Sequence, residues 1–128
     1  MTAKAPASTA SVAQELVALC REGRNLDAVN KLYSPRIHSI ESSGSPEMPA
    51  EMDGIEAIRG KHEWWDANNQ VHSIEVNGPF LSEDQFAVQF TFDATFKPTG
   101  ERKKMTEMAL YTVRDGKIVR EQFFYNPV

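Results

Sequence analysis

The chain has a single cysteine, Cys20, and no long apolar run. One cysteine excludes an internal disulfide bond and a clustered thiolate metal site. No segment approaches the roughly 18 apolar residues that a membrane-spanning helix needs, and residues 1–10 lack the apolar centre of a signal peptide. We therefore expect a cytoplasmic protein with no membrane partner.

Positive charge is also scarce, with 14 basic against 18 acidic residues and a net charge of −4. This balance gives no general attraction to nucleic acid. The segment His62–Asp66 begins like a zinc-protease motif, but Asp66 stands where the second histidine ligand is required. A glycine-rich phosphate loop and a nucleophile elbow are absent as well. The sequence therefore predicts no nucleic-acid partner, no metal and no cofactor.

What remains has the size and composition of one globular domain: 128 residues, of which 41% are hydrophobic. Residues 1–10 are dominated by small and polar side chains, so we expect a disordered tail. The domain is then predicted to comprise residues 11–128.

Three segments in the first half show apolar side chains at helical spacing. Each is preceded by a residue that caps helix N-termini, namely Ser11, Asn25 and Asp53. The three helices are predicted to end near Gly23, before Ser34-Pro35, and at about Asn69. Between the second and third helices, Arg36–Ser42 is predicted as a short strand and Ser43–Met52 as a loop.

After Gln70 the apolar period changes from helical spacing to two. Four segments rich in β-branched and aromatic residues predict an antiparallel meander: Val71–Leu81, Gln85–Lys97, Arg102–Arg114 and Lys117–Asn126. Helices first and strands afterwards, without βαβ alternation, predict an α+β domain with the helices on one face of a curved sheet.

The face of each strand that meets the helices follows from this alternation. In the second long strand the apolar residues are Phe86, Val88, Phe90, Phe92, Ala94 and Phe96. If Pro98–Glu101 form a four-residue loop, Glu107 lies opposite Phe92.

The final hairpin allows two registers. A two-residue turn at Asp115-Gly116 directs Arg120, Gln122 and Phe124 inward, whereas a three-residue loop with a Gly116 bulge directs Glu121, Phe123 and Tyr125 inward.

The segment Gly54–Lys61, the closing segment Tyr111–Ile118 and the order of the elements resemble the SnoaL-like branch of the nuclear-transport-factor-two-like superfamily, over residues 11–126. The resemblance implies a cystatin-like fold, in which three N-terminal helices pack on a strongly curved, mainly antiparallel sheet to form a cone with an internal pocket. It also implies a homodimer through the outer sheet faces. Because this fold serves enzymes, carriers and transport factors, it does not fix the function.

Resemblance of the closing strand to that of ketosteroid isomerase favours the register with Glu121, Phe123 and Tyr125 inside. By the same resemblance, Glu41 falls where that enzyme carries its carboxylate base. A carboxylate among aromatic rings would have a raised pKa, as proton transfer near neutral pH requires. The alternative is an exposed glutamate at a strand end.

Other inward groups complete the candidate catalytic set of Glu41, His62, Glu107, Tyr111 and Glu121. His62 shares a helical stripe with Ile58 and Trp65 and is either an acid–base group or a hydrogen-bonded core histidine. Glu107 either donates a proton or pairs with a basic residue such as Arg120. The candidate substrate-binding wall is Trp65, Phe90, Phe92, Phe123 and Tyr125.

Two classes of function remain open at this stage. The leading hypothesis is a SnoaL-like protein that binds a hydrophobic, oxygenated small molecule, with cofactor-free lyase, isomerase or cyclase chemistry. The alternative is a non-catalytic ligand-binding or protein-interaction module. On the outer sheet face, an unusually apolar set predicts the homodimer contact: Ala87, Gln89, Thr91, Thr106, Met108 and Leu110.

Overall fold

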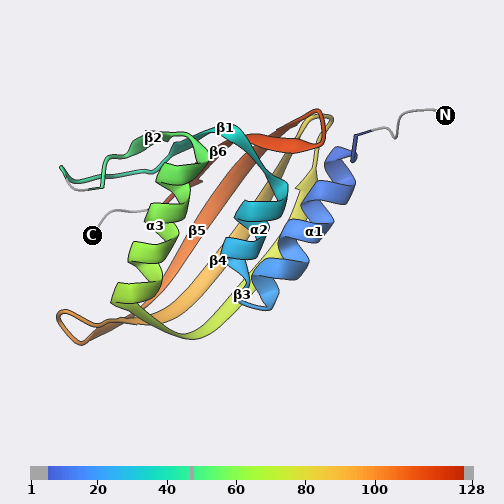
Figure 1. The fold of residues 1–128 in the computed structure, drawn as a ribbon. Helices are drawn as coiled ribbons and strands as arrows, with labels where there is room; N and C mark the ends of the chain where they lie inside the picture. Colours follow the sequence, from blue (N-terminus) through green and yellow to red (C-terminus); the bar gives the residue numbers. More distant parts are fainter. Residues whose placement is uncertain (1–5, 47, 126–128) are drawn as a thin grey trace.

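The computed structural model describes residues 6–46 and 48–125, in which three helices lie on one side of a six-stranded sheet (Figure 1). The helices are α1 (Thr9–Arg21), α2 (Asn25–Leu32) and α3 (Ile55–Asn68). The strands are β1 (Tyr33–Ile40), β2 (Glu51–Asp53), β3 (Asn69–Leu81), β4 (Gln85–Phe96), β5 (Glu101–Arg114) and β6 (Lys117–Phe124). This arrangement confirms the predicted α+β architecture with helices on one face of a curved sheet.

The strand order is β2-β1-β6-β5-β4-β3, and every neighbouring pair is antiparallel except β1 and β6, which are parallel. Helix α1 packs mainly on β3, and α3 packs mainly on β1 (Figure 1). The core lies between the helices and the inner face of the sheet. Its most deeply buried members include Val12, Leu16, Val29, Ile37, Ile58, Phe86, Val88, Ala109 and Ile118. In the described ranges, no helix combines the length and the apolar character that crossing a membrane would take.

The helix caps differ from those predicted. Helix α1 begins at Thr9 rather than after Ser11, because the Ser8 hydroxyl accepts the Ser11 N–H at 3.0 Å. Two residues of the predicted tail therefore belong to a helix, while residues 1–5 lie outside the described residues. Asn25 is the first residue of α2 rather than its cap.

Asp53 does not cap α3, because its carboxylate contacts the ring of His38 at 2.6 Å. Asp53 instead ends β2, a short strand inside the predicted loop, which pairs with β1. Strand β1 also begins earlier than predicted, since Tyr33 directly follows α2.

The β4–β5 register is shifted by two residues from the prediction. The turn comprises residues 97–100 rather than Pro98–Glu101, because Gly100 adopts φ 73° and donates its N–H to the Phe96 carbonyl at 2.8 Å. Glu107 therefore lies opposite Phe90, not Phe92. A shift by two residues leaves every side chain on its predicted face.

The last hairpin combines features of both predicted registers. Its turn has two residues, Asp115 and Gly116, both with positive φ, so the three-residue loop was wrong. A bulge at Val119 then shifts the pairing by one residue, because Val113 lies opposite Ile118 whereas Thr112 lies opposite Arg120. As a result Glu121 and Phe123 face inward, as the favoured register predicted. Residues 126–128, which the prediction placed in the last strand and domain end, lie outside the described residues.

The Ser8 cap can be tested against the predicted Ser11 cap. We expect Ser8→Ala to lower the free energy of unfolding by about 1 kcal/mol, because the Ser11 N–H loses its acceptor. The matched control, Ser11→Ala, removes an exposed hydroxyl and should change it by less than about 0.5 kcal/mol. Urea denaturation measures both, and a larger effect at Ser11 would contradict the assignment.

Candidate functional site

A fully buried carboxylate, that of Glu121, forms the centre of a polar cluster inside the cone. The Ser39 hydroxyl donates to it at 2.9 Å, and the Tyr33 hydroxyl also donates to it. The ammonium group of Lys61 lies 3.4 Å from the same carboxylate. A buried charge is costly unless it is paired and hydrogen-bonded, and these three donors satisfy that requirement.

Lys61 joins Glu121 to a second carboxylate. Its Nζ lies 2.9 Å from both Glu41 Oε1 and Ser39 Oγ, and 5.0 Å from the centre of the Phe123 ring. Burial alone would lower the pKa of Lys61, but the charges of Glu121 and Glu41 outweigh it and raise that pKa above its ordinary value. One cation is therefore shared by two carboxylates.

Glu41 lies at the outer end of this cluster, just after β1. Burial, together with the charge of Glu41 and a hydrogen bond to it, raises the pKa of Tyr125. Ser42 fixes this corner, because its hydroxyl donates to the Phe123 carbonyl at 2.8 Å and accepts the Tyr125 N–H at 3.1 Å. The end of β6 is thus held against the segment that carries Glu41.

Glu107 is the third carboxyl group on the inner face, opposite Phe90 on the neighbouring strand. Burial and the nearby charge of Glu41 raise the pKa of Glu107 to about 8, with a smaller addition from Glu121, although Lys61 opposes the shift. Glu107 is therefore largely protonated at neutral pH. The predicted alternative partner, Arg120, instead donates to the Gln122 side chain at 3.1 Å.

The remaining two predicted catalytic residues are His62 and Tyr111. Burial and the charge of Lys61 lower the pKa of His62 to about 4, so its imidazole is neutral at neutral pH. Tyr111 is buried in the core, where its ring stacks on Phe86 with centroids 4.8 Å apart. Burial and the charge of Glu121 raise the pKa of Tyr111 well above its usual range.

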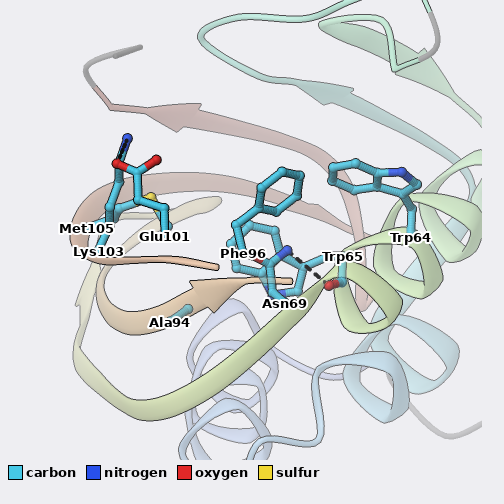
Figure 2. A pocket seen from close by; sticks show the side chains of 8 residues that line it. All are labelled: Trp64, Trp65, Asn69, Ala94, Phe96, Glu101, Lys103 and Met105. Carbon is cyan, nitrogen blue, oxygen red and sulfur yellow. Dashed lines mark hydrogen bonds and ion pairs between the residues drawn. The ribbon is translucent and has the colours of Figure 1, made fainter. Parts of the chain in front are cut away.

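Aromatic rings surround the polar cluster on the inner face. Phe90 and Phe92 stack with centroids 6.0 Å apart, and Trp65 lies 6.0 Å from Phe92. A cavity of about 210 Å³ lies beyond this wall (Figure 2). Its lining consists of Trp64, Trp65, Asn69, Ala94, Phe96, Glu101, Lys103 and Met105. In Figure 2 the tryptophans project from α3, and Glu101, Lys103 and Met105 come from β5 on the opposite side.

A second cavity, of about 430 Å³, lies where β6 ends and β5 continues. Its lining consists of Ser42, Gln89, Thr106, Glu107, Met108, Phe124 and Tyr125. Two of these residues, Glu107 and Tyr125, lie near the polar cluster, since the charge of Glu41 raises the pKa of each. This cavity therefore gives a ligand access to the protonated carboxyl group.

Among the predicted catalytic residues, the structure brings Glu41 and Glu121 to one lysine and places Glu107 within their electrostatic influence. Of the predicted binding residues, Trp65 lines the first cavity and Tyr125 the second, while Phe90, Phe92 and Phe123 belong to or pack on the core.

Sequence analysis missed three members of the cluster: Tyr33, Ser39 and Lys61. Ser39 alternates with Ile37 and Glu41 along β1, and Lys61 lies three residues after buried Ile58 on α3. In both cases the spacing indicates that the side chain lies on the same face as a buried residue.

Comparison with known proteins gives a consistent family match. A family model for the SnoaL-like domain matches residues 7–125. A Mesorhizobium loti protein, described as a candidate SnoaL-like polyketide cyclase and also as a carbohydrate phosphatase, is 42% identical, with a TM-score of 0.88 over 93% of this chain and 100% of that one.

More distant structures show the same fold. One is a Xanthomonas campestris protein of unknown function with a cystatin-like fold, which is 16% identical with a TM-score of 0.75 over 94% of this chain and 92% of that one. Another is a candidate isomerase from Bacillus subtilis, 19% identical with a TM-score of 0.72 over 89% of this chain and 83% of that one. No curated protein matches the chain.

The raised pKa of Glu107 predicts a specific dependence of stability on pH. Because the folded pKa of about 8 exceeds the ordinary value of 4.5, the folded state holds this proton more tightly. The resulting stabilisation is complete below about pH 4.5 and is lost as the pH rises to about 8. Relative to Glu107→Gln, the wild-type free energy of unfolding should therefore fall between pH 5 and 8, by up to about 4 kcal/mol.

Urea denaturation across this pH range measures the difference, and carbon-13 NMR of the side-chain carboxyl groups measures the midpoint directly. A Glu107 midpoint near 4.5, with parallel stability profiles for the two proteins, would contradict the assignment.

Proposed function

Because the chain belongs to the SnoaL-like family, we propose that it binds a hydrophobic, oxygen-bearing small molecule and performs cofactor-free acid–base chemistry of the lyase, isomerase or cyclase kind. The reaction would occur where the aromatic wall meets Glu41 and Glu107. We place the protein in the cytoplasm, an assignment supported by its single, buried cysteine.

The observation that supports this proposal best is the difference between the two carboxyl groups. Glu41 is the ion-pair partner of Lys61 at 2.9 Å, whereas Glu107 is half-buried and has a pKa of about 8. Two carboxyl groups in different environments are the usual arrangement for an acid and a base at one pH. Glu41 is accordingly the proton acceptor and Glu107 the proton donor.

In the proposed reaction, Glu41 removes a proton from the carbon next to a substrate carbonyl group. The electron pair of the broken C–H bond forms a C=C bond, and the carbonyl π electrons move to oxygen, which takes the proton of Glu107. Lys61 holds Glu41 in position. The enol then regains a proton at another carbon, attacks an internal carbonyl, or expels a leaving group, which gives isomerisation, cyclisation or elimination, respectively.

Hydrogen exchange tests this chemistry before the natural substrate is known. In D₂O, the wild type should catalyse deuterium incorporation next to the carbonyl of aryl ketones, measured by proton NMR. Glu41→Gln should lower that rate at least about 100-fold, because the base is lost. The same change should lower the pKa of Glu107, since the charge of Glu41 raises it.

The control for this experiment is Glu75→Gln, which removes one negative charge from an exposed position on β3. It should leave both the exchange rate and the pKa of Glu107 unchanged. Undiminished exchange in Glu41→Gln would remove Glu41 from the reaction.

We further propose that two copies associate through the outer sheet face. The three helices cover the inner face and leave the outer face open (Figure 1). Met108 and Phe124 are paired across β5 and β6, and 37% and 47% of their respective surfaces are exposed. Exposed apolar side chains on an open sheet face favour burial against a second copy, which would here border the larger cavity, because both residues line it.

The double substitution Met108→Lys and Phe124→Lys should therefore convert a dimer into a monomer, because it places four charges in the contact. Sedimentation velocity at several protein concentrations measures the change. Ala18→Lys on the exposed side of α1 is the control and should remain dimeric. A wild-type monomer at all concentrations would refute the dimer.

A further inference from the structure

The charges inside the cone do not balance. Glu41 and Glu121 lie 2.9 Å and 3.4 Å from Lys61, which is the only cation of this cluster in the described part of the chain. A third carboxyl group, Glu107, faces the same interior without a basic partner of its own in the described ranges. His62 adds no positive charge at neutral pH.

Lys61 is also fully engaged. Its ammonium group has three N–H donors, and the surrounding acceptors are Glu41, Ser39 and Glu121. The Phe123 ring lies 5.0 Å from the same nitrogen. No N–H of Lys61 is left for a ligand unless a carboxylate is displaced.

The residues that line the two cavities also offer little positive charge to a ligand. None of the described residues around the larger cavity is basic, and its acidic group is Glu107. The smaller cavity contains one basic residue, Lys103, which lies 3.4 Å from Glu101. A ligand therefore meets aromatic rings, hydroxyl groups and carboxyl groups, but no cation that is free to bind an anion.

From this imbalance we propose that the site selects uncharged carbonyl compounds and rejects carboxylates and phosphate esters of the same shape. This inference rests on the proposed function and narrows its substrate class. An anion in the larger cavity would meet Glu107 and no basic side chain among the described lining residues, near a cluster in which two glutamates share one lysine, and burial strengthens that repulsion. An uncharged ketone or ester instead accepts a hydrogen bond from the protonated Glu107.

A matched pair of probes tests the selection without the natural substrate. 2-Acetylnaphthalene is an uncharged aryl ketone, and 2-naphthoate is an anion of nearly the same shape. Binding is followed at pH 7 through the side-chain NMR signals of Met108 and Tyr125, which line the larger cavity together with Glu107, and by calorimetry. We expect the ketone to bind at least tenfold more tightly than the carboxylate.

Two variants test whether this cluster causes the preference for the ketone over the carboxylate. Glu41→Gln leaves Lys61 with one carboxylate and should bring the two affinities within about threefold of each other. The control Glu75→Gln has the same change in total charge on an exposed part of β3 and should retain the wild-type ratio.

Raising the pH from 6 to 9 should weaken naphthoate binding further in the wild type, because Glu107 ionises near pH 8. This dependence should disappear in Glu107→Gln. Over this range Lys61 stays charged and His62 stays neutral, and the raised pKa values of Tyr111 and Tyr125 keep their hydroxyl groups protonated.

Equal binding of the two probes to the wild type would overturn the inference, as would failure of the ketone to bind. The test of ligand selectivity and the test of the proposed reaction can fail independently. Loss of deuterium exchange with intact charge discrimination would refute the chemistry alone, whereas equal binding would refute the selectivity whether or not exchange occurs.

Discussion

Burial of the Glu121 carboxylate is the constraint on which the rest of the cone depends, because a charge without solvent must be surrounded by donors. Those donors come from three places: Tyr33 at the junction of α2 and β1, Ser39 farther along β1, and Lys61 on α3. β1 must therefore lie beside β6, and α3 must cross above both. Removing any one of these elements would take away one of the three donors, so the polar cluster and the fold support each other.

The chemistry follows from the same constraint. Since Lys61 is shared with Glu121, its single positive charge neutralises Glu41 only in part and offsets only part of the negative charge near Glu107. The third carboxyl group responds as a buried acid near other negative charges does, by keeping its proton to a higher pH. The structural requirement at Glu121 thus accounts for the raised pKa of Glu107, the group that we propose as the proton donor.

The order of the elements was predictable because apolar periodicity is a property of neighbouring residues. The inward positions of Phe86 to Phe96 followed from alternation alone. The Val119 bulge could not be predicted, because a single extra residue leaves no local pattern and is decided by what the strand packs against. In this chain, β6 packs against the donors that surround Glu121. Lys61 was missed for a related reason: lysine is normally solvated, and only the combined positions of two distant glutamates make its burial favourable.

The unequal lengths of β5 and β6 determine where the interior opens. β6 ends at Phe124, opposite Met108, whereas β5 continues to Glu101 at its other end. Glu107 lies immediately beyond the last paired position, so its inner side faces the cluster while its surroundings border the larger cavity. Ser42 holds the end of β6 beside Glu41, the proposed base, and lines the same cavity as Glu107, the proposed acid.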